Sequence, residues 1–355
     1  MRPLPTRKPT PRKAHYARRL LAVVGMVGFL CSASHSVGFG IFNATGLNGG
    51  SRWDAAPRTL GGVERSLDGG LRFSLQGGSY QSYRDLFSWS GPTPSVASFE
   101  QAVLEAFAFW TMSDPQTDLG TTLKFVPDLA TPVSRATSGS VRLGAEIDLF
   151  GAIDGAFWDP GDSGNRAEAF FDSVSVSGNL KLTSGTTNYP GFAISGADIT
   201  FNTNPGAQYS LTSFRTILTH EIGHTLGFAD VDITSGASGT FIDDNLNASN
   251  SQTALATLTN SYALLINPFN PAASPLQLYT VADGDPGFDT SGVDILMESS
   301  IPEAFFGTGL SLSNDDFAGR QFMYPVPEPA STMLLLFALF LCLRRFRLHT
   351  QEPGA

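Results

Sequence analysis

Residues 220–230 read HEIGHTLGFAD, a run with two histidines one helical turn apart and a glutamate beside the first. On a helix, His220 and His224 share one face, close enough for both imidazoles to reach a single Zn²⁺. Glu221 sits one step round the helix, beside the ion, where it can take a proton from a water on the metal and pass it to a leaving amine. The run therefore predicts zinc-assisted hydrolysis of a peptide bond without a covalent intermediate.

The third metal ligand should be an oxygen, because the other three histidines lie near the ends of the chain, at positions 15, 35 and 349. Gly227, three residues after His224, can adopt a positive φ and turn the chain back, so that Asp230 returns toward the metal. Asp232 is the alternative ligand, in which case Asp230 caps the helix end. We expect one zinc per chain, held by His220, His224 and Asp230.

The first 36 residues are typical of a signal peptide. They carry seven Arg or Lys, followed by an apolar run over 20–31 and the small residues Ser32, Ala33 and Ser34. An uncleaved anchor is the alternative, but the run is short for a bilayer span of about 20 residues. We therefore expect residues 37–325 to form an exported body.

The last segment, residues 326–355, contains the triplet Pro327-Glu328-Pro329, a short apolar run over 333–343 and three arginines. It resembles the PEP-CTERM sorting signal of Gram-negative bacteria. The resemblance implies that an exosortase-type membrane enzyme cuts near the triplet and leaves the body extracellular or at the cell surface after transient membrane anchoring. A plain tail anchor is the alternative, and the run is short for that as well.

Charge and cysteine content limit the partners of the body. Both cysteines, Cys31 and Cys342, fall in the terminal segments, so the body has no disulfide. Between residues 37 and 329 the basic residues fall from 22 to 12 and the acidic ones from 32 to 31, so the net charge changes from −10 to −19. Such a surface repels nucleic acid and anionic lipid, so contact with a membrane is expected only through the terminal segments.

The body reads as one α+β domain. Alternating apolar residues predict strands over 71–75, 122–126, 145–150 and 197–202. Apolar residues at helical spacing predict a helix over about 99–112, capped by Ser98. The histidine helix is expected over about 213–226, with Thr212 or Ser213 as its cap and Gly227 beyond its end. Its apolar row recurs every four residues, at Phe214, Leu218, Ile222 and Leu226.

An acidic, turn-rich loop is expected over 154–172. Asp159, Asp162 and Asn165 are spaced so that their oxygens could hold a calcium ion. A solvated loop without metal is the favoured alternative, because no EF-hand pattern is present.

The run HExxHxxGxxD resembles the zinc signature of the metzincin proteases, with Asp230 where most members have histidine. Residues 294–299 look like the family's Met-turn, which places Met297 beneath the metal ligands. Residues 310–325 are similar to the C-terminal helix of the matrixin-type members, with Ser313 and Asp316 spaced as a capping box. The resemblance implies a twisted, mostly parallel sheet, an active-site helix, a second long helix, and a C-terminal subdomain with the Met-turn and a terminal helix.

Two further features differ from the family pattern. No additional histidines exist for the structural zinc that matrix metalloproteinases carry, so a single zinc is expected. An insert of 66 residues separates Asp230 from Met297 and is expected to border the cleft.

Two functions remain after these observations. The first is a secreted or surface-displayed zinc endopeptidase that cleaves extracellular protein or peptide. The second is a non-catalytic zinc-binding protein with a structural or adhesive role in an extracellular matrix or biofilm. Glu221 favours the first, because a non-catalytic protein has no chemical need for a base beside the metal.

Overall fold

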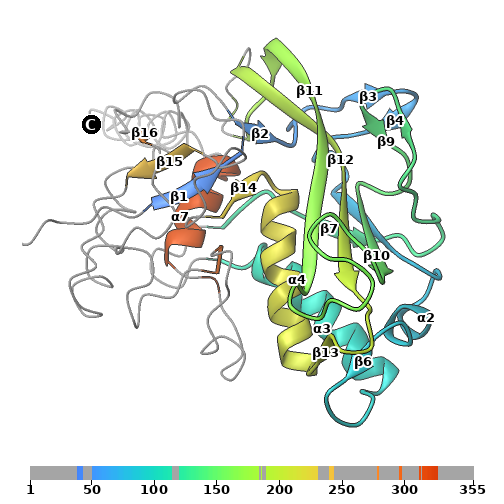
Figure 1. Cartoon of the computed structure of the whole chain (residues 1–355). Helices are drawn as coiled ribbons and strands as arrows, with labels where there is room; N and C mark the ends of the chain where they lie inside the picture. Colours follow the sequence, from blue (N-terminus) through green and yellow to red (C-terminus); the bar gives the residue numbers. More distant parts are fainter. Residues whose placement is uncertain are drawn as a thin grey trace, which may run out of the picture.

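The computed structural model describes residues 38–42, 50–113, 120–183, 185, 189–230, 240–243, 278–279, 296–297, 312 and 314–326. These residues form an α+β structure in which two long helices pack against one face of a mostly parallel sheet (Figure 1). The expected α+β class with a mostly parallel sheet is confirmed.

The central sheet has six strands, and five of them follow the order β11-β12-β10-β5-β7. Strand β10 runs parallel to β12 and β5, β5 runs parallel to β7, and the short β2 adds in parallel to β12. Among the described strands of this sheet, only β11, at one edge, is antiparallel to its neighbour. Their bounds are Ser51–Arg52 (β2), Leu71–Leu75 (β5), Phe125–Pro127 (β7), Ile147–Ala152 (β10), Ala167–Leu180 (β11) and Tyr189–Asn202 (β12).

Strand β5 has the predicted bounds, whereas the other strands differ from prediction. β7 begins three residues later and β10 two residues later than predicted, and β12 begins eight residues earlier. The predicted loop over 154–172 ends at residue 166, because β11 begins at Ala167 and pairs with Phe201 of β12. In β11, every second residue packs against the core: Ala167, Ala169 and Phe171. This alternation of side chains is typical of a strand.

The second long helix, α3 (Val96–Phe109), begins earlier than predicted. Its cap is Ser95, whose hydroxyl accepts a hydrogen bond from Ser98 N at 3.1 Å, so Ser98 lies within the first turn. The helix ends at Phe109 and is capped by Trp110, three residues short of the predicted end.

The histidine helix, α4 (Leu211–Thr225), is capped by Ser210 and not by Thr212 or Ser213. Ser210 and Ser213 form a reciprocal capping box, with Ser213 N donating to Ser210 Oγ at 3.0 Å and Ser210 N donating to Ser213 Oγ at 2.9 Å. At the other end Gly227 has φ +99°, which confirms the predicted turn.

The apolar side of α4 packs between α3 and the sheet. The predicted row of Phe214, Leu218, Ile222 and Leu226 is completely buried. Phe214 contacts the ring of Phe99 on α3 and that of Phe201 on β12, both at 4.9 Å between centroids. Burial of each such side chain contributes about 1.5–3 kcal/mol, so this packing fixes the position of the histidine helix on the sheet.

A second, antiparallel sheet of four strands, in the order β14-β1-β15-β16, lies at the C-terminal end of α4 (Figure 1). Its strands are β1 (Gly38–Ile41), β14 (Phe228–Ala229), β15 (Thr240–Asp243) and β16 (Leu278–Tyr279). β15 and β16 belong to the insert after Asp230, and the rest of that insert up to residue 295 lies outside the described residues.

The remaining elements are short. The helices are α2 (Tyr80–Arg84) and α7 (Asn314–Met323), and the paired strands are β3 (Thr59–Leu60) with β4 (Val63–Glu64), β6 (Ser88–Trp89) with β13 (Gln208–Tyr209), and β8 (Thr137–Ser138) with β9 (Val141–Arg142). Helix α7 lies within the predicted C-terminal helix, but the side chain of Ser313, and with it the predicted capping box, lies outside the described residues.

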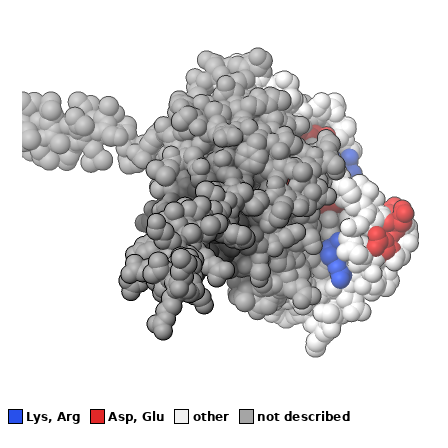
Figure 2. Space-filling view, turned by 60° about the vertical axis from the view of Figure 1, so that its left-hand side comes forward, with Lys and Arg blue, Asp and Glu red and all other residues white. Residues whose placement is uncertain are grey.

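The predicted signal peptide and PEP-CTERM segment also lie outside the described residues, and with them both cysteines. Within the described residues no helix is long and apolar enough to cross a membrane. On the face seen in Figure 2, the described surface is mostly uncharged, with acidic and basic side chains in small separate groups.

Asp148 of β10 offers a test of the packing. Its carboxylate accepts hydrogen bonds from Ser134 N (2.8 Å) and Ala145 N (3.1 Å), and burial raises its pKa to about 7. Because this folded-state pKa lies above the unfolded value of about 3.9, the stability that the residue contributes is complete below about pH 4 and is lost as the pH rises through 7. The melting temperatures of Asp148→Asn and wild type should be measured at pH 4.5 and pH 8. The melting temperature of the variant relative to that of wild type should be higher at pH 8 than at pH 4.5. An equal difference at both values would contradict this account.

Candidate metal centre

Helix α4 brings His220 and His224 together at its buried C-terminal half. Their Nε2 atoms lie 2.9 Å apart, and the two residues are only 5% and 8% exposed. Because residues four apart lie about one helical turn apart, both rings lie on the face opposite the apolar row, with their planes inclined by 89°. Imidazoles buried at this distance need either a shared proton or a cation between them.

The other ring nitrogens are held by backbone carbonyls. His220 Nδ1 lies 2.7 Å from Leu296 O, and His224 Nδ1 lies 2.9 Å from Phe228 O. A carbonyl oxygen only accepts hydrogen bonds, so each Nδ1 carries a hydrogen, and in the neutral form of each ring the lone pair of Nε2 is directed toward the other ring. Outer hydrogen bonds of this kind orient metal-binding histidines.

Asp230 completes the group. It follows β14, after the chain has turned at Gly227, and its Oδ1 lies 3.3 Å from His220 Nε2 and 3.2 Å from His224 Nε2. These three ligand atoms lie within 4.8 Å of one another, and no other described set of three or more His, Cys, Asp or Glu residues does so. The alternative ligand, Asp232, lies outside the described residues.

The electrostatics of the group favour a cation. Burial acts to raise the pKa of Asp230, but the two imidazoles outweigh it and hold this pKa well below its usual range. Burial acts to lower the pKa of His224, but the Asp230 carboxylate outweighs it and raises this pKa to about 9. The Asp230 carboxylate is therefore ionised at neutral pH, and its charge is balanced by a proton on His224, which a bound metal ion would replace.

Glu221 is buried beside this group, at 5% exposure. Burial raises the pKa of its carboxyl, although the two histidines act in the opposite direction. Among the described residues, no hydrogen bond reaches its Oε2. A buried carboxylate oxygen without a partner is costly, and it is available to accept a hydrogen bond from a water or a substrate.

Met297 packs directly against α4 at Gly223, a residue that lies between His220 and His224 in the sequence. A Cβ atom on Gly223 would collide with Met297 Sδ and would lie 2.8 Å from Trp110 Cζ2. Met297 is only 2% exposed, and the preceding residue is fixed by a hydrogen bond from Leu296 N to Asp316 Oδ2 at 3.2 Å. Asp316 thus ties α7 to the turn that also holds His220.

Two aromatic residues hold the C-terminal end of α4. Trp53 Nε1 donates to Thr225 O at 2.9 Å, and the Tyr324 hydroxyl donates to Leu226 O at 2.6 Å. Trp53 N in turn donates to the Tyr324 hydroxyl at 3.1 Å. The last carbonyls of a helix have no partner within it, so these bonds satisfy them and fix the point where the chain turns toward Asp230.

The strand β1 contributes residues that the sequence analysis did not find. Gly40 pairs with Ala229 and Ile41 with Phe228, and Phe42 N donates to Gly227 O at 3.0 Å. The ring of Phe42 lies 5.8 Å from that of His224. The N-terminal strand therefore holds the segment between His224 and Asp230 in place. Nothing in the sequence near Phe42 indicated this role, because the contact joins distant parts of the chain.

The three residues of the predicted calcium site lie in a loop that is fixed by amide groups. Asn202 Nδ2 donates to Asp162 O at 3.0 Å and to Asn165 O at 2.7 Å, and Asp162 Oδ1 accepts from Gly164 N at 2.7 Å. The side-chain nitrogen of Asn165 donates to Phe157 O. These bonds account for the shape of the loop without an ion, and calcium binding, involving Asp159 as well, remains a prediction.

The sequence matches no protein-family model. No curated protein is similar enough to be recognised as a relative.

The contact between Met297 and Gly223 can be tested by Gly223→Ala. The added methyl group has no room, so we expect a loss of about 1–3 kcal/mol in the free energy of unfolding, measured by denaturant titration. Gly91→Ala is the matched control, because nothing lies within 4 Å of a Cβ at that position. Equal stability of the two variants would show that Met297 does not pack against α4 in this way.

Proposed function

We propose that this protein is a zinc metalloendopeptidase in which His220, His224 and Asp230 bind the metal and Glu221 acts as general base and acid. The observation that carries the proposal is the convergence of two imidazole Nε2 atoms and one carboxylate oxygen, with both Nδ1 atoms bonded to carbonyls. This leaves three electron-pair donors that face one another in a buried site.

The distances fit a zinc ion. In a tetrahedral site with ligands about 2.0–2.1 Å from zinc, neighbouring ligand atoms lie about 3.3 Å apart. The corresponding separations here are 2.9, 3.2 and 3.3 Å. Two histidines and a carboxylate are a known ligand set of catalytic zinc, which leaves the fourth position for water or substrate.

Bound zinc would polarise the peptide carbonyl and lower the pKa of water to about 7. The protein's own contribution to the reaction comes from Glu221. Its raised pKa and unpartnered Oε2 suit a base that accepts a proton from the attacking water as the carbon–oxygen bond forms. The same carboxyl then gives this proton to the amine nitrogen as the carbon–nitrogen bond breaks.

Several features support a metzincin-like assignment. Helix α4 packs on the sheet and contacts β11, which is at the sheet edge and is the one antiparallel strand among the described strands of that sheet. Met297 packs against α4 at Gly223, as the resemblance to a Met-turn implies. Helix α7 follows it and binds the turn through Asp316.

The alternative is a zinc-binding structural or adhesive matrix protein without turnover. Such a protein gains nothing from Glu221, since burying a carboxylate oxygen without a partner costs free energy. The position of this residue beside the metal ligands therefore favours the enzyme.

The proposed setting is extracellular. The terminal segments suggest export, processing by an exosortase-type enzyme, and release or display at the surface of a Gram-negative cell. An extracellular protein or peptide is then the expected substrate, and the acidic body disfavours nucleic acid.

Glu221→Gln separates metal binding from catalysis. The variant should keep one zinc per chain, measured by elemental analysis, while its hydrolysis of casein falls about 10²- to 10⁴-fold because the proton acceptor is lost. Glu100→Gln, on α3, is the control and should behave like wild type. Casein cleavage at the wild-type rate by Glu221→Gln would refute the mechanism, and a wild type that binds zinc but cleaves no protein would favour the structural alternative.

Asp230→Ala tests the third ligand. Removal of a direct ligand should weaken zinc binding by more than the roughly 10- to 100-fold expected for loss of an outer hydrogen-bond partner. Competition with a chromophoric chelator measures this, and Asp85→Ala, an exposed carboxylate on the surface, serves as control. Full zinc occupancy in Asp230→Ala would point to Asp232 or another ligand.

A further inference from the structure

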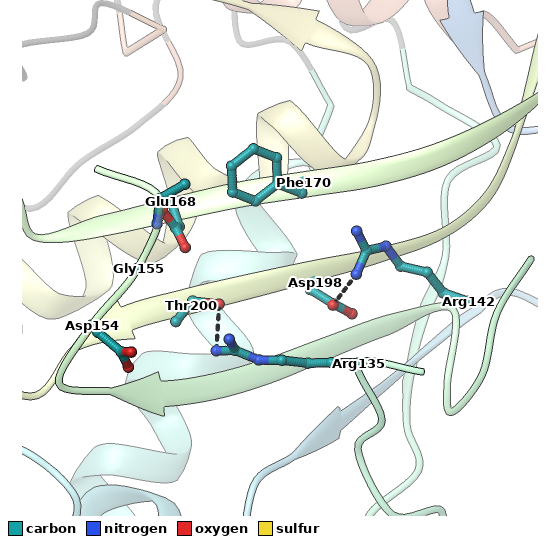
Figure 3. A pocket seen from close by; sticks show the side chains of 9 residues that line it. Arg135, Arg142, Asp154, Gly155, Glu168, Phe170, Asp198 and Thr200 are labelled. Atoms are coloured by element: carbon teal, nitrogen blue, oxygen red, sulfur yellow. Dashed lines mark hydrogen bonds and ion pairs between the residues drawn. The ribbon is translucent and has the colours of Figure 1, made fainter. Parts of the chain in front are cut away.

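The face of the central sheet opposite α3 and α4 carries a polar hollow of about 360 Å³ (Figure 3). It arises from the alternation of β12, where Ala197, Ile199 and Phe201 pack into the core and the residues between them point the other way. Asp198 and Thr200 therefore lie on the far side of the sheet from the metal ligands, where they line the hollow.

Asp198, which lines the hollow, has a buried carboxylate oxygen that receives no hydrogen bond from the described residues. Asp198 is only 4% exposed, and its Oδ2 is paired with Arg142 Nη1. Arg142 also reaches Asp172, with its Nε 3.0 Å from Asp172 Oδ2. Within the described residues no hydrogen bond reaches Asp198 Oδ1. This atom requires a donor, and the hollow is the direction from which a ligand could supply one.

The hollow is lined by hydrogen-bond donors as well as acceptors. Arg135 lies over the ring of Phe150, 4.8 Å from its centroid, and one of its five N–H groups donates to Thr200 Oγ1 at 3.1 Å. Glu168 is buried on the neighbouring strand, where its Oε2 accepts from Ala156 N at 2.8 Å. Figure 3 shows Arg135 and Arg142 extending along the hollow with Glu168 and Asp198 between and beside them.

Exposed aromatic rings border the hollow. Phe170, which lines it, is 39% exposed, and Phe157 is 61% exposed. The two rings are stacked, with centroids 6.0 Å apart and planes inclined by 16°. An exposed pair of large apolar rings beside a polar hollow is typical of a surface that binds a ligand with both apolar and polar parts.

We propose that this hollow binds a neutral, hydroxyl-rich saccharide. A sugar hydroxyl both donates and accepts, so neighbouring hydroxyls match the alternation of carboxylate and guanidinium groups, and one of them can donate to Asp198 Oδ1. The C–H face of a sugar ring is apolar and can lie on the Phe170 ring. The volume is within the range of small-ligand sites, about 300–1,000 Å³.

The charges around the hollow disfavour other ligand classes. An anionic ligand would meet the carboxylates of Asp154, Glu168 and Asp198, and a cationic one would meet the guanidinium groups of Arg135 and Arg142. A neutral ligand avoids both repulsions. Because His220 and His224 belong to the helix on the other side of the sheet, saccharide binding and peptide hydrolysis are independent, and this inference does not rest on the proposed enzyme activity.

Affinity electrophoresis of the full chain tests the proposal, with native gels that contain dextran, mannan, laminarin or hydroxyethylcellulose. Wild type should be retarded by at least one of these neutral polymers. Phe170→Ala and Phe157→Ala should each weaken the retardation at least about 10-fold in apparent dissociation constant. Leu104→Ala, an apolar residue on α3 that is also 39% exposed, is the matched control and should leave binding unchanged.

Two outcomes would overturn the proposal. The first is mobility that none of the four polymers affects, or that changes only in gels with charged polygalacturonate or chitosan. The second is retardation that is the same in wild type, Phe170→Ala and Phe157→Ala, because binding would then occur elsewhere. The Glu221→Gln variant should bind like wild type, so failure of the saccharide site and failure of the enzyme proposal can be told apart.

Discussion

Two hydrogen bonds from imidazole to backbone organise the structure: His220 Nδ1 to Leu296 O and His224 Nδ1 to Phe228 O. They require that Nδ1 of each ring carries a hydrogen, and they join α4 to two other segments of the chain. The first bond holds the turn that contains Met297, and the second holds the strand that leads to Asp230. The remaining contacts around α4 keep these partners in place.

The supports around α4 come from all parts of the chain. Trp53 and Tyr324 bind the last carbonyls of the helix, Trp110 Nε1 donates to Thr219 O at 2.8 Å, and Phe42 lies against His224. Each buried hydrogen bond contributes only about 0.5–1.5 kcal/mol, but together they restrict the ligand-bearing segments to one arrangement. A metal site needs such restriction, since its ligands must stay within a few tenths of an ångström of their positions.

The alternation of the sheet strands separates two surfaces with different chemistry. One side of β12 packs against the helices, of which α4 carries His220 and His224, while the other carries buried polar groups and the hollow beside Phe170. The proposed metal site and the proposed saccharide site therefore share no residues.

The sequence by itself determined the local features of this protein: the spacing of His220 and His224, the buried row on α4, and the turn at Gly227. These features depend on the periodicity of the helix and on the positive φ that glycine can adopt, and both are determined by residues close together in the sequence. Helix starts were misplaced, because Ser95 and Ser98, like Ser210 and Ser213, are equally good caps in isolation.

Only the tertiary structure decided which distant groups complete the site. The bond from His220 to Leu296 spans 76 positions, and that from Trp53 to Thr225 spans 172. Leu296 and Phe228 act through carbonyl oxygens that every residue possesses, so their side chains carry no signal of the role. Phe42 and the hollow around Asp198 likewise depend on how strands pair, which local patterns do not specify.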